Sequence, residues 1–256
     1  MHRRLALVRR PSPRLADGIV THIERSGSVD VGLALRQWQE YVDVLRRRGW
    51  SVVEAPPVDD CPDGVFIEDQ VVVHGDVAVL CRSGAPERRA ERAGVREAVE
   101  AYGYRTVEVE EPGTLDGGDV LKHGHVVWVG VGGRTNLAGV DQLRRAWDGH
   151  RVEVVPVPVS KVLHLKSAVT ALPDGTVLGY PPLVDDLSAW PEFLAVPEES
   201  GAHVVLLGGM SVLMSASAPR TAQLLAARGH DVTTVDISEF EKLEGCVTCL
   251  SVRLRG

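Results

Sequence analysis

Apolar residues recur along the chain at two spacings, and each spacing predicts one type of element. Over residues 33–48 they return every three or four positions, which is typical of an amphipathic helix packed on one side. Gly49 follows the basic last turn of this segment, where glycine ends a helix because it adopts the left-handed backbone conformation at little cost. The apolar run that comes next predicts a strand.

The same helix–glycine–strand pattern recurs at four more glycines, Gly103, Gly149, Gly201 and Gly229. The five joints lie about 45 residues apart on average, which indicates a repeated unit. Short runs of β-forming residues, such as residues 70–82, lie between the joints. Each unit is therefore predicted to contain two or three strands and one helix.

A unit repeated at this period favours a closed radial array, because closure removes the exposed edges of open sheets. An open, doubly wound sheet also alternates helices and strands and is the alternative. The hairpin-like pairs of strands within each unit fit that alternative poorly, since a simple βαβ repeat has no such pairs. We therefore predict a single α/β domain over residues 1–256, built as a five-bladed, pseudo-symmetric α/β propeller.

Composition narrows the classes of function. Of the 256 residues, 44% are hydrophobic and 25% are charged, as in ordinary globular proteins, and the net charge of −7 argues against nucleic acid as a partner. The four cysteines are too few for a disulfide scaffold, and Cys81 falls within a β-type run, so we expect reduced thiols and a cytoplasmic location. The N-terminal segment shows no signal-peptide pattern, and no window reaches the about 18 apolar residues of a membrane span.

Polar residues gather in the segments that follow the predicted joint strands. If the units surround an axis, these segments are neighbours in space although they are far apart in the chain. Together they would bring a thiol, an imidazole and several carboxylates to one place. These residues are Asp63, Glu68, Asp69, Asp116, Asp119, His164 and Cys249.

Each of these residues has a purely structural interpretation when taken alone. Cys249 fits a small buried side chain, His164 fits a hydrogen-bonded core histidine, and the LDGGD segment fits an ordinary turn. The CVTC segment matches half of a structural zinc site but has no second pair, so we predict no metal. Taken together, the residues favour nucleophilic catalysis, because a carboxylate can hold one nitrogen of a buried histidine while the other nitrogen faces a thiol.

The remaining carboxylates predict a cationic ligand, because crowded buried anions repel one another unless a positive charge joins them. A guanidinium group suits this role, since it is planar and meets carboxylates in paired hydrogen bonds. Arg82 and Arg134 each follow a β-type run. They could lie on the surface, or they could hold the carboxylate of an amino-acid substrate.

Five motifs, FIEDQVVV, TLDGGDVL, GGRTN, LHLKS and CVTCLSV, occur in the order found in one known family. Over nearly the whole chain the sequence resembles the dimethylarginine dimethylaminohydrolase family, which has the five-bladed α/β propeller called the pentein fold. The resemblance implies that Cys249 is the nucleophile, that His164 is the general acid and base, and that Asp116 is the carboxylate beside it. The implied substrate contacts are Ile19, Asp63, Phe66, Glu68, Asp69, Arg82, Arg134, Ser167 and Leu243.

The resemblance also implies a role for most of these contacts. Asp69 is the expected partner of the substrate guanidinium, and Phe66 is expected to pack on the alkyl stem. The backbone carbonyls of Ile19 and Leu243 are expected to receive the α-amino group. Arg82 and Arg134 match the residues that hold the α-carboxylate.

The implied reaction is hydrolysis of Nω-methylated L-arginine to L-citrulline and methylamine or dimethylamine, through a covalent thiouronium on the cysteine and without a cofactor. The partner is expected to be a small guanidino amino acid, not nucleic acid or a membrane, and a homodimer is left open. Arginine deiminase, agmatine deiminase or amidinotransferase activity on the same scaffold are alternatives, as is a non-catalytic amino-acid-binding propeller. No redox role for Cys61 or Cys246 follows from the sequence.

Overall fold

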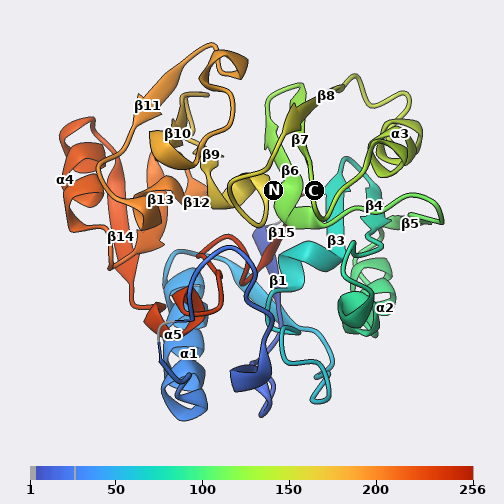
Figure 1. Ribbon diagram of the computed structural model, residues 1–256, viewed down its shortest axis with the longest axis horizontal. Helices are drawn as coiled ribbons and strands as arrows, with labels where there is room; N and C mark the ends of the chain where they lie inside the picture. Colours follow the sequence, from blue (N-terminus) through green and yellow to red (C-terminus); the bar gives the residue numbers. More distant parts are fainter. Residues whose placement is uncertain (1–3, 26, 256) are drawn as a thin grey trace.

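The structure, a computed structural model, describes residues 4–25 and 27–255, and this part of the chain forms five separate three-stranded sheets. The sheets surround a centre, and the helices lie on the outside (Figure 1). In each sheet the middle strand pairs antiparallel with an inner strand and parallel with an outer strand. The predicted five-bladed propeller is thus confirmed, and the open doubly wound sheet is excluded.

The strands fall into three sets by their position in the sheets. The inner strands are β3 (Val71–His74), β6 (Val120–His123), β9 (Val169–Ala171), β12 (Val205–Gly208) and β15 (Val252–Arg255). The middle strands are β1 (Arg4–Val8), β4 (Val77–Leu80), β7 (Val126–Val131), β10 (Val177–Gly179) and β13 (Ser211–Ser215). The outer strands are β2 (Ser51–Glu54), β5 (Arg105–Glu108), β8 (Glu153–Pro158), β11 (Phe193–Ala195) and β14 (Asp231–Val235).

Four helices connect middle strands to outer strands, as a parallel pair requires. They are α1 (Val31–Arg47), α2 (Val95–Glu100), α3 (Leu137–Ala146) and α4 (Pro219–Ala227), and a short α5 (Ser238–Glu241) follows β14. Helix α1 buries Trp38, Tyr41 and Leu45 on one face. The Asp30 side chain caps its start by accepting a hydrogen bond from the Leu33 amide at 2.9 Å.

Four of the five predicted glycine joints have the expected conformation. Gly49, Gly103, Gly149 and Gly229 have φ angles of 81, 86, 86 and 89°, in the left-handed region that ends a helix before a strand. The joint at Gly201 was predicted wrongly, because this glycine lies in a 3-10 turn that leads into an inner strand.

The fourth sheet lacks the helix that its unit was predicted to contain. Between β10 and β11 the described chain forms only two 3-10 turns, Pro181–Leu183 and Leu187–Ala189. Prolines 181, 182 and 191 fall in this connection, and proline removes the amide hydrogen that a helix interior needs. The unit therefore keeps its three strands but crosses between them without an α-helix.

Hydrophobic clusters join neighbouring sheets around the ring. One cluster contains Leu7 and Leu254 of the β15–β1–β2 sheet together with Val73 and Leu80 of the β3–β4–β5 sheet. The other clusters span adjacent sheets in the same way. Face-to-face packing of this kind fixes each sheet against the next and so fixes the turns at the ends of the inner strands.

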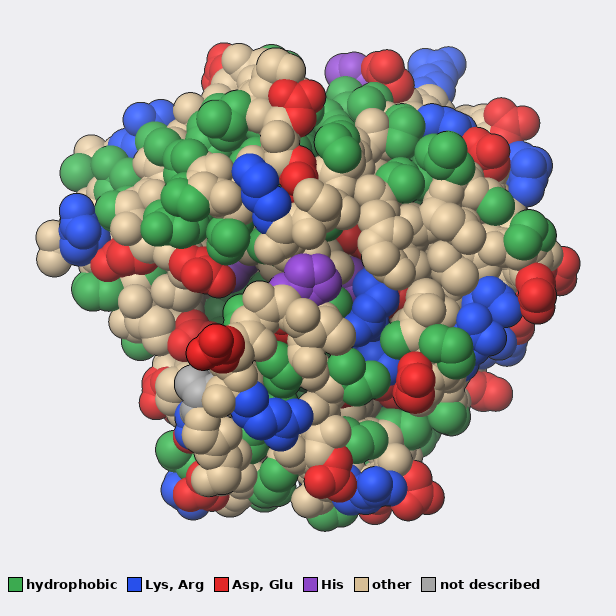
Figure 2. Space-filling model, viewed as in Figure 1, with side chains coloured by type: hydrophobic (Ala, Val, Ile, Leu, Met, Phe, Trp, Pro, Cys, Tyr) green, Lys and Arg blue, Asp and Glu red, His purple; other side chains and the backbone are tan. Residues whose placement is uncertain are grey.

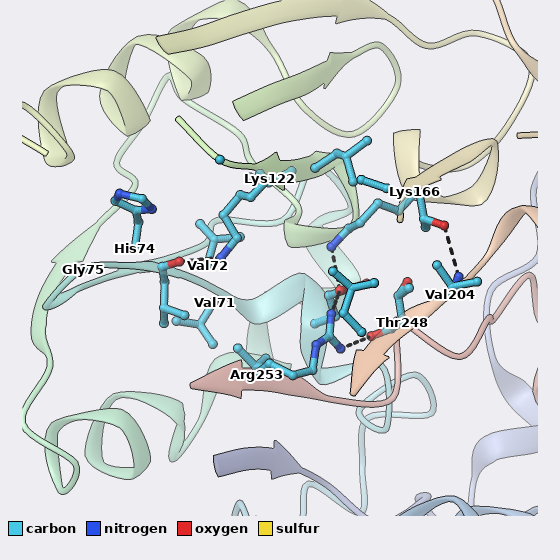
Figure 3. A pocket seen from close by; sticks show the side chains of 18 residues that line it. Val71, Val72, His74, Gly75, Lys122, Lys166, Val204, Thr248 and Arg253 are labelled. Atoms are coloured by element: carbon cyan, nitrogen blue, oxygen red, sulfur yellow. Dashed lines mark hydrogen bonds and ion pairs between the residues drawn. The ribbon is translucent and has the colours of Figure 1, made fainter. Parts of the chain in front are cut away.

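A cavity of about 310 Å³ occupies the centre of the ring, and residues of all five inner strands line it. Figure 3 shows this central cavity with Lys122, Lys166 and Arg253 directed toward it. The inner strands therefore present one set of side chains to the central cavity, while the turns at their starts are free to form a separate site.

The surface carries charges of both signs. On the face shown in Figure 2, acidic and basic side chains are interspersed with hydrophobic ones. This distribution agrees with the net charge of −7 and offers no concentrated basic band on that face for a phosphate backbone. Among the described residues, none of the helices is long and apolar enough to cross a membrane.

Candidate active site

Short 3-10 turns at the starts of the inner strands carry the polar residues. Turn η2 (Ile67–Gln70) leads into β3, turn η4 (Gly117–Asp119) leads into β6, and turn η5 (Leu165–Ser167) leads into β9. Turn η4 contacts both η2 and η5. Equivalent positions of three units therefore meet, as the radial arrangement predicts.

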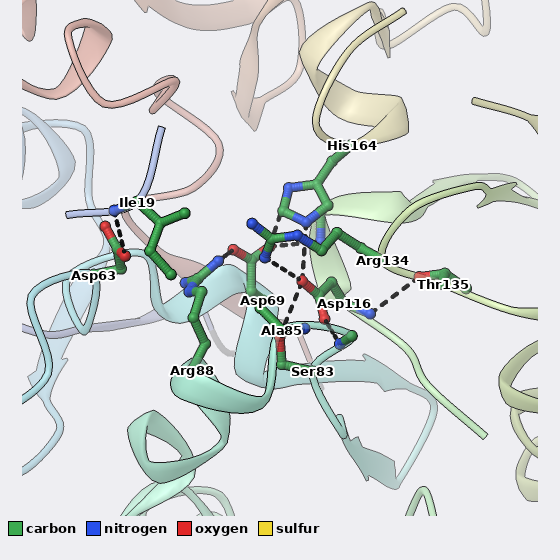
Figure 4. Close-up of polar contacts among 12 residues, drawn as sticks. Ile19, Asp63, Asp69, Ser83, Ala85, Arg88, Asp116, Arg134, Thr135 and His164 are labelled. Carbon is green, nitrogen blue, oxygen red and sulfur yellow. Dashed lines mark hydrogen bonds and ion pairs between the residues drawn. The ribbon is translucent and has the colours of Figure 1, made fainter. Parts of the chain in front are cut away.

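His164 lies immediately before η5 and is only 2% exposed. Its Nε2 is 3.0 Å from Asp116 Oδ2, and its Nδ1 is 3.7 Å from Asp69 Oδ1 (Figure 4). Burial opposes a charged imidazole, but the carboxylates of Asp69, Asp116 and Asp119 together raise the pKa of His164 to about 9. His164 therefore carries a proton at neutral pH.

Asp116 holds the imidazole and is itself held by several donors. Its Oδ1 accepts a hydrogen bond from the Gly84 amide at 3.1 Å. Its Oδ2 accepts from Ser83 Oγ at 3.3 Å and from Arg134 Nη1 at 3.4 Å. The carboxylate is completely buried, so these contacts fix its orientation toward His164.

Asp69 lies on the other side of the imidazole. Its Oδ1 accepts the Gly118 amide at 2.9 Å, and its Oδ2 accepts Arg88 Nη1 at 2.8 Å. Burial disfavours its charge, yet His164 and Arg88 lower the pKa of Asp69 to about 2. Gly118 is needed at this place, because a Cβ there would lie 2.6 Å from His164 Nδ1.

Asp119 supports the turn that presents the histidine. Its Oδ2 accepts the Thr135 hydroxyl at 2.6 Å, and its Oδ1 accepts the Leu165 amide at 2.9 Å. Burial raises the pKa of Asp119 to about 6 despite these donors and the nearby His164. Asp119 thus fixes the start of η5 and does not line the cavity described next.

Cys249 and His164 line the same narrow cavity. Cys249 is 7% exposed, and its carbonyl accepts a hydrogen bond from the Glu68 amide at 3.2 Å, which ties the C-terminal segment to η2. The structure also brings six of the residues predicted to bind substrate into the lining. They are Ile19, Asp63, Phe66, Asp69, Arg134 and Leu243.

The thiol of Cys249 has a second thiol beside it. Its Sγ lies 3.2 Å from Cys246 Sγ. This hydrogen bond, together with burial and the negative charges of Glu68 and Asp69, raises the pKa of Cys249 well above its usual range. The nucleophile candidate is therefore protonated until another group stabilises its thiolate.

Asp63 offers the cavity an acceptor. Its Oδ2 accepts the Ile19 amide at 3.0 Å, while its Oδ1 is buried without a hydrogen-bond partner among the described residues (Figure 4). Burial raises the pKa of this carboxyl group. The ring of Phe66 packs edge-to-face on Phe240, with centroids 6.3 Å apart, and forms an apolar wall of the same cavity.

Arg82 does not line this cavity, contrary to its predicted role. Its guanidinium donates to the Gly113 carbonyl at 3.2 Å and pairs with Glu111 at 3.2 Å.

Arg88, only 4% exposed, lines the cavity instead and was not predicted from the sequence. It donates twice to Glu91, at 2.9 and 2.8 Å. The one available signal was an arginine three residues before a glutamate, and Arg89 and Arg92 in the same segment obscure it.

Glu68 also lies elsewhere than predicted. Its side chain turns to the central cavity, where it pairs with Lys166 at 2.6 Å and with Arg253 at 3.2 Å (Figure 3). The neighbouring Asp69 faces the candidate site, because successive residues of a 3-10 turn point in different directions.

Ser167 was predicted to bind substrate but lies outside the candidate site. It lines a different cavity together with His203. Its backbone carbonyl lies 2.9 Å from His203 Nε2. Ser167 falls at the end of η5, one 3-10 turn beyond His164, and so lies on the far side of the turn that presents the histidine.

Glu244 was not predicted from the sequence, yet it closes one side of the cavity. Its carboxylate accepts the amides of Thr21 and Ile23, each at 3.0 Å, and also the amide of His22. Its own φ angle is 61°. Glu244 thereby pins the segment after Ile19 against the segment that carries Cys249.

Asp69, Asp116 and His164 each place one ligand atom within 4.8 Å of the others, a spacing that a metal ion could use. Here, however, Arg88 and Arg134 donate to the carboxylates and the imidazole is protonated. Positive neighbours of this kind oppose a metal cation. The three residues therefore suit an ion-paired hydrogen-bond network better than a metal site.

Known proteins resemble this chain along most of its length. The family model described as N,N dimethylarginine dimethylhydrolase, eukaryotic, matches residues 14–171. The N(G),N(G)-dimethylarginine dimethylaminohydrolase of Streptomyces coelicolor is 66% identical over 250 residues, which cover 98% of this chain and 96% of that protein. The protein of the same name from Pseudomonas aeruginosa is 33% identical over 254 residues, which cover 96% of this chain and 98% of the relative.

Solved structures of dimethylarginine dimethylaminohydrolases share the fold. A variant captured as an adduct with S-methyl-L-thiocitrulline superposes with a TM-score of 0.91 at 29% identity, over 99% of this chain and 100% of that one. A cysteine-to-serine variant of the Pseudomonas aeruginosa protein, in complex with citrulline, also gives a TM-score of 0.91, at 30% identity over 98% and 99% of the two chains.

Proposed function

This chain belongs to the dimethylarginine dimethylaminohydrolase family and hydrolyses dimethylarginine to L-citrulline, and we propose that Cys249, His164 and Asp116 carry out that reaction. The observation that carries the proposal is a single cavity lined by the Cys249 thiol and by His164, whose Nε2 Asp116 holds at 3.0 Å. A nucleophile, a proton donor and a carboxylate that orients the donor are the parts that covalent hydrolysis of a guanidinium needs.

The first half of the reaction forms a covalent intermediate. The thiolate of Cys249 attacks the central guanidinium carbon, and the bond from that carbon to the methylated nitrogen then breaks. His164 donates its proton to the departing amine, because an amine leaves poorly as an anion. A thiouronium remains on the cysteine sulfur. With its pKa raised to about 9, His164 holds the required proton at neutral pH.

The second half uses the same histidine as a base. After giving up its proton, neutral His164 takes one from a water molecule that attacks the thiouronium carbon. The carbon–sulfur bond then breaks, the hydroxyl proton of the water adduct passes to solvent as the carbonyl of L-citrulline forms, and the thiolate is restored on Cys249. Asp116 keeps the ring in place through both steps and favours its positive form.

The substrate itself assists the nucleophile. Cys249 is protonated in the free protein because Cys246, burial and nearby carboxylates raise its pKa. A guanidinium entering the cavity adds a positive charge beside the sulfur and so favours the thiolate. Asp63 Oδ1, which has no partner among the described residues, is the acceptor that we assign to a positive group of the substrate.

The remaining contacts fit an α-amino acid. We assign the α-carboxylate to Arg134 and Arg88, the two arginines that line the cavity. The backbone carbonyls of Ile19 and Leu243 receive the α-amino group, and Phe66 packs on the alkyl stem. Arginine and its methylated forms have all three features, whereas agmatine lacks the carboxylate.

The proposal extends to the domain organisation and the cellular location of the protein. We propose that residues 1–256 act as one catalytic domain and that the protein works in the cytoplasm, since its four cysteines are all free thiols. The ligand is a small guanidino amino acid, and neither nucleic acid nor a membrane is involved. A homodimer stays a prediction, which analytical ultracentrifugation would test.

A substrate panel tests the proposed function. Purified protein is incubated with asymmetric dimethylarginine, monomethylarginine, arginine and agmatine, and the amine products are identified. We expect citrulline with dimethylamine or methylamine from the methylated substrates. Ammonia from arginine as the main product would favour a deiminase, and transfer to an added amine would favour an amidinotransferase. Binding without any product would favour an amino-acid-binding module.

Arg134→Ala is expected to raise the KM for dimethylarginine by about 10- to 100-fold, because a hydrogen bond between charged groups is lost. Arg82→Ala is the matched control, since Arg82 pairs with Glu111 outside the cavity, and its KM should stay within about twofold of the unmodified protein. Steady-state kinetics on both variants make the comparison. An equal rise in KM for Arg82→Ala would contradict the assignment.

A further inference from the structure

A second thiol touches the nucleophile, and the proposed reaction has not used it. Cys246 Sγ lies 3.2 Å from Cys249 Sγ, and both residues belong to one turn, in which the Cys249 amide donates to the Cys246 carbonyl at 3.1 Å. Cys246 is 3% exposed. Only Cys249 of the two lines the cavity, so Cys246 contacts the reacting sulfur from its protein side.

The two sulfurs share one proton. Donation from the Cys249 thiol lowers the pKa of Cys246 to about 5, and nearby His203 acts in the same direction although burial opposes both. The same contact raises the pKa of Cys249. The contact therefore favours one proton shared between the two sulfurs, with the negative charge favoured on Cys246 over Cys249.

The groups around the pair explain this preference. Asp69 disfavours a negative charge on Cys249 and His203 favours one on Cys246, while Glu68 disfavours a charge on either sulfur. A positive ligand in the cavity would act on Cys249, because that sulfur and not its neighbour lines the cavity. Asp63, Asp69, Arg88, Arg134, His164 and Glu244 line the cavity with Cys249, and Tyr41, Glu68 and His203 lie near enough to act on one or both thiols.

The proton of the Cys249 thiol needs an acceptor other than His164. His164 is protonated at neutral pH and must keep that proton for the departing amine. It cannot also remove the proton of the Cys249 thiol. The sulfur of Cys246, already at hydrogen-bond distance, can remove it without any movement of the chain.

We propose that Cys246 is the proton acceptor for the nucleophile. When the guanidinium binds, the proton moves from Cys249 Sγ to Cys246 Sγ, and the negative charge moves the other way. The Cys246 thiol then donates a hydrogen bond to the Cys249 thiolate as it attacks. When the thiolate leaves the adduct that water forms with the thiouronium carbon, the pair again holds one proton and one charge, so the cycle closes. This role rests on the proposed function of Cys249.

Alkylation kinetics test the proposal without turnover. The rate of modification of Cys249 by iodoacetamide is measured against pH, and mass spectrometry identifies the modified residue. Cys246→Ala removes both the acceptor and the hydrogen bond, whereas Cys246→Ser keeps a hydroxyl donor that cannot hold the charge. Cys61→Ala is the matched control, because Cys61 is a free thiol outside the cavity. Thermal unfolding followed by circular dichroism confirms that each variant is folded.

Without a ligand in the cavity, we expect the midpoint of alkylation to fall in Cys246→Ala, because the neighbouring sulfur that raises the pKa of Cys249 is lost. Cys246→Ser, which cannot carry the charge, should fall as well, and Cys61→Ala should not change. The acid limb of kcat/KM for dimethylarginine should nevertheless move to higher pH in both Cys246 variants, because the proton of Cys249 then has no acceptor within the protein. An unchanged midpoint in Cys246→Ala would overturn the proposal, and so would a wild-type midpoint in Cys246→Ser, because a donor alone would then suffice. Since alkylation needs no methylated substrate, these outcomes are separate from a failure of the proposed function.

Discussion

Replacing Cys249 with serine is expected to lower the turnover of dimethylarginine by about 10⁴-fold or more. The loss should be in kcat and not in substrate binding. A serine hydroxyl is far less acidic than a thiol, and the positive guanidinium that favours a thiolate cannot ionise it at neutral pH. Isothermal titration should still detect binding of dimethylarginine, because the carboxylates and Arg134 that line the cavity are untouched.

Two further measurements test whether the covalent intermediate forms on Cys249 and not on another thiol. Quenching the unmodified protein during turnover should trap a covalent adduct on the peptide that contains residue 249, and the serine variant should show none. Cys61→Ala removes a thiol elsewhere and should keep full activity. If the serine variant hydrolysed dimethylarginine at more than about one hundredth of the normal rate, covalent catalysis by Cys249 would be ruled out.

Replacing His164 with asparagine is expected to lower turnover of dimethylarginine by about 10²- to 10⁴-fold, the usual contribution of a general acid and base. The two roles can be separated with S-methyl-L-thiocitrulline, whose thiolate leaving group needs little help from an acid. The variant should still form a covalent adduct with this compound, because Cys249 is intact. Hydrolysis of the adduct should be slow, since no base activates water. Rapid mixing with mass spectrometry measures both steps.

His230→Asn provides the control for this experiment. His230 is a buried histidine that precedes β14 and does not line the cavity. Its replacement should leave both the formation and the hydrolysis of the adduct unchanged. If His164→Asn hydrolysed the adduct as fast as the unmodified protein, another group would have to act as the base. Asp116→Asn should slow the same steps by less, because Asp116 acts through the imidazole, which it orients and whose positive form it favours.

The parts of the fold that were predictable depend on local chemistry. Glycine ends helices through its left-handed conformation, and that signal correctly located the joints at Gly49, Gly103, Gly149 and Gly229. The same signal was misleading at Gly201, which lies in a 3-10 turn. A glycine before a strand gives the same sequence pattern whether or not an α-helix precedes it. The convergence of His164 with its carboxylates followed from the repeat itself, because equivalent turns of a ring must face its axis.

The choice between neighbouring side chains was not predictable. Glu68 and Asp69 are adjacent and chemically alike, and only the geometry of their 3-10 turn sends one to the central cavity and the other to the site. The position of Arg82 directly after a β-type run favours it as a ligand-binding residue, whereas Arg88 has no comparable signal in the sequence. Its backbone forms a bridge with Leu115, and its side chain is thereby directed away from the cavity. Such directions depend on long-range packing that no local pattern contains.

The pairing of β1 with β15 has a consequence for the newly made protein. The ring closes only when a strand from the start of the chain meets one from its end, and Cys249 stands three positions before that closing strand. During synthesis on the ribosome, Asp63 and Asp69 of the cavity are therefore made long before Cys249 is added to the chain. A premature stop codon upstream of Cys249 would leave the inner edge of β1 without its partner strand, and unpaired strand edges associate with other chains. Such a product would be inert toward methylated arginines and prone to aggregate.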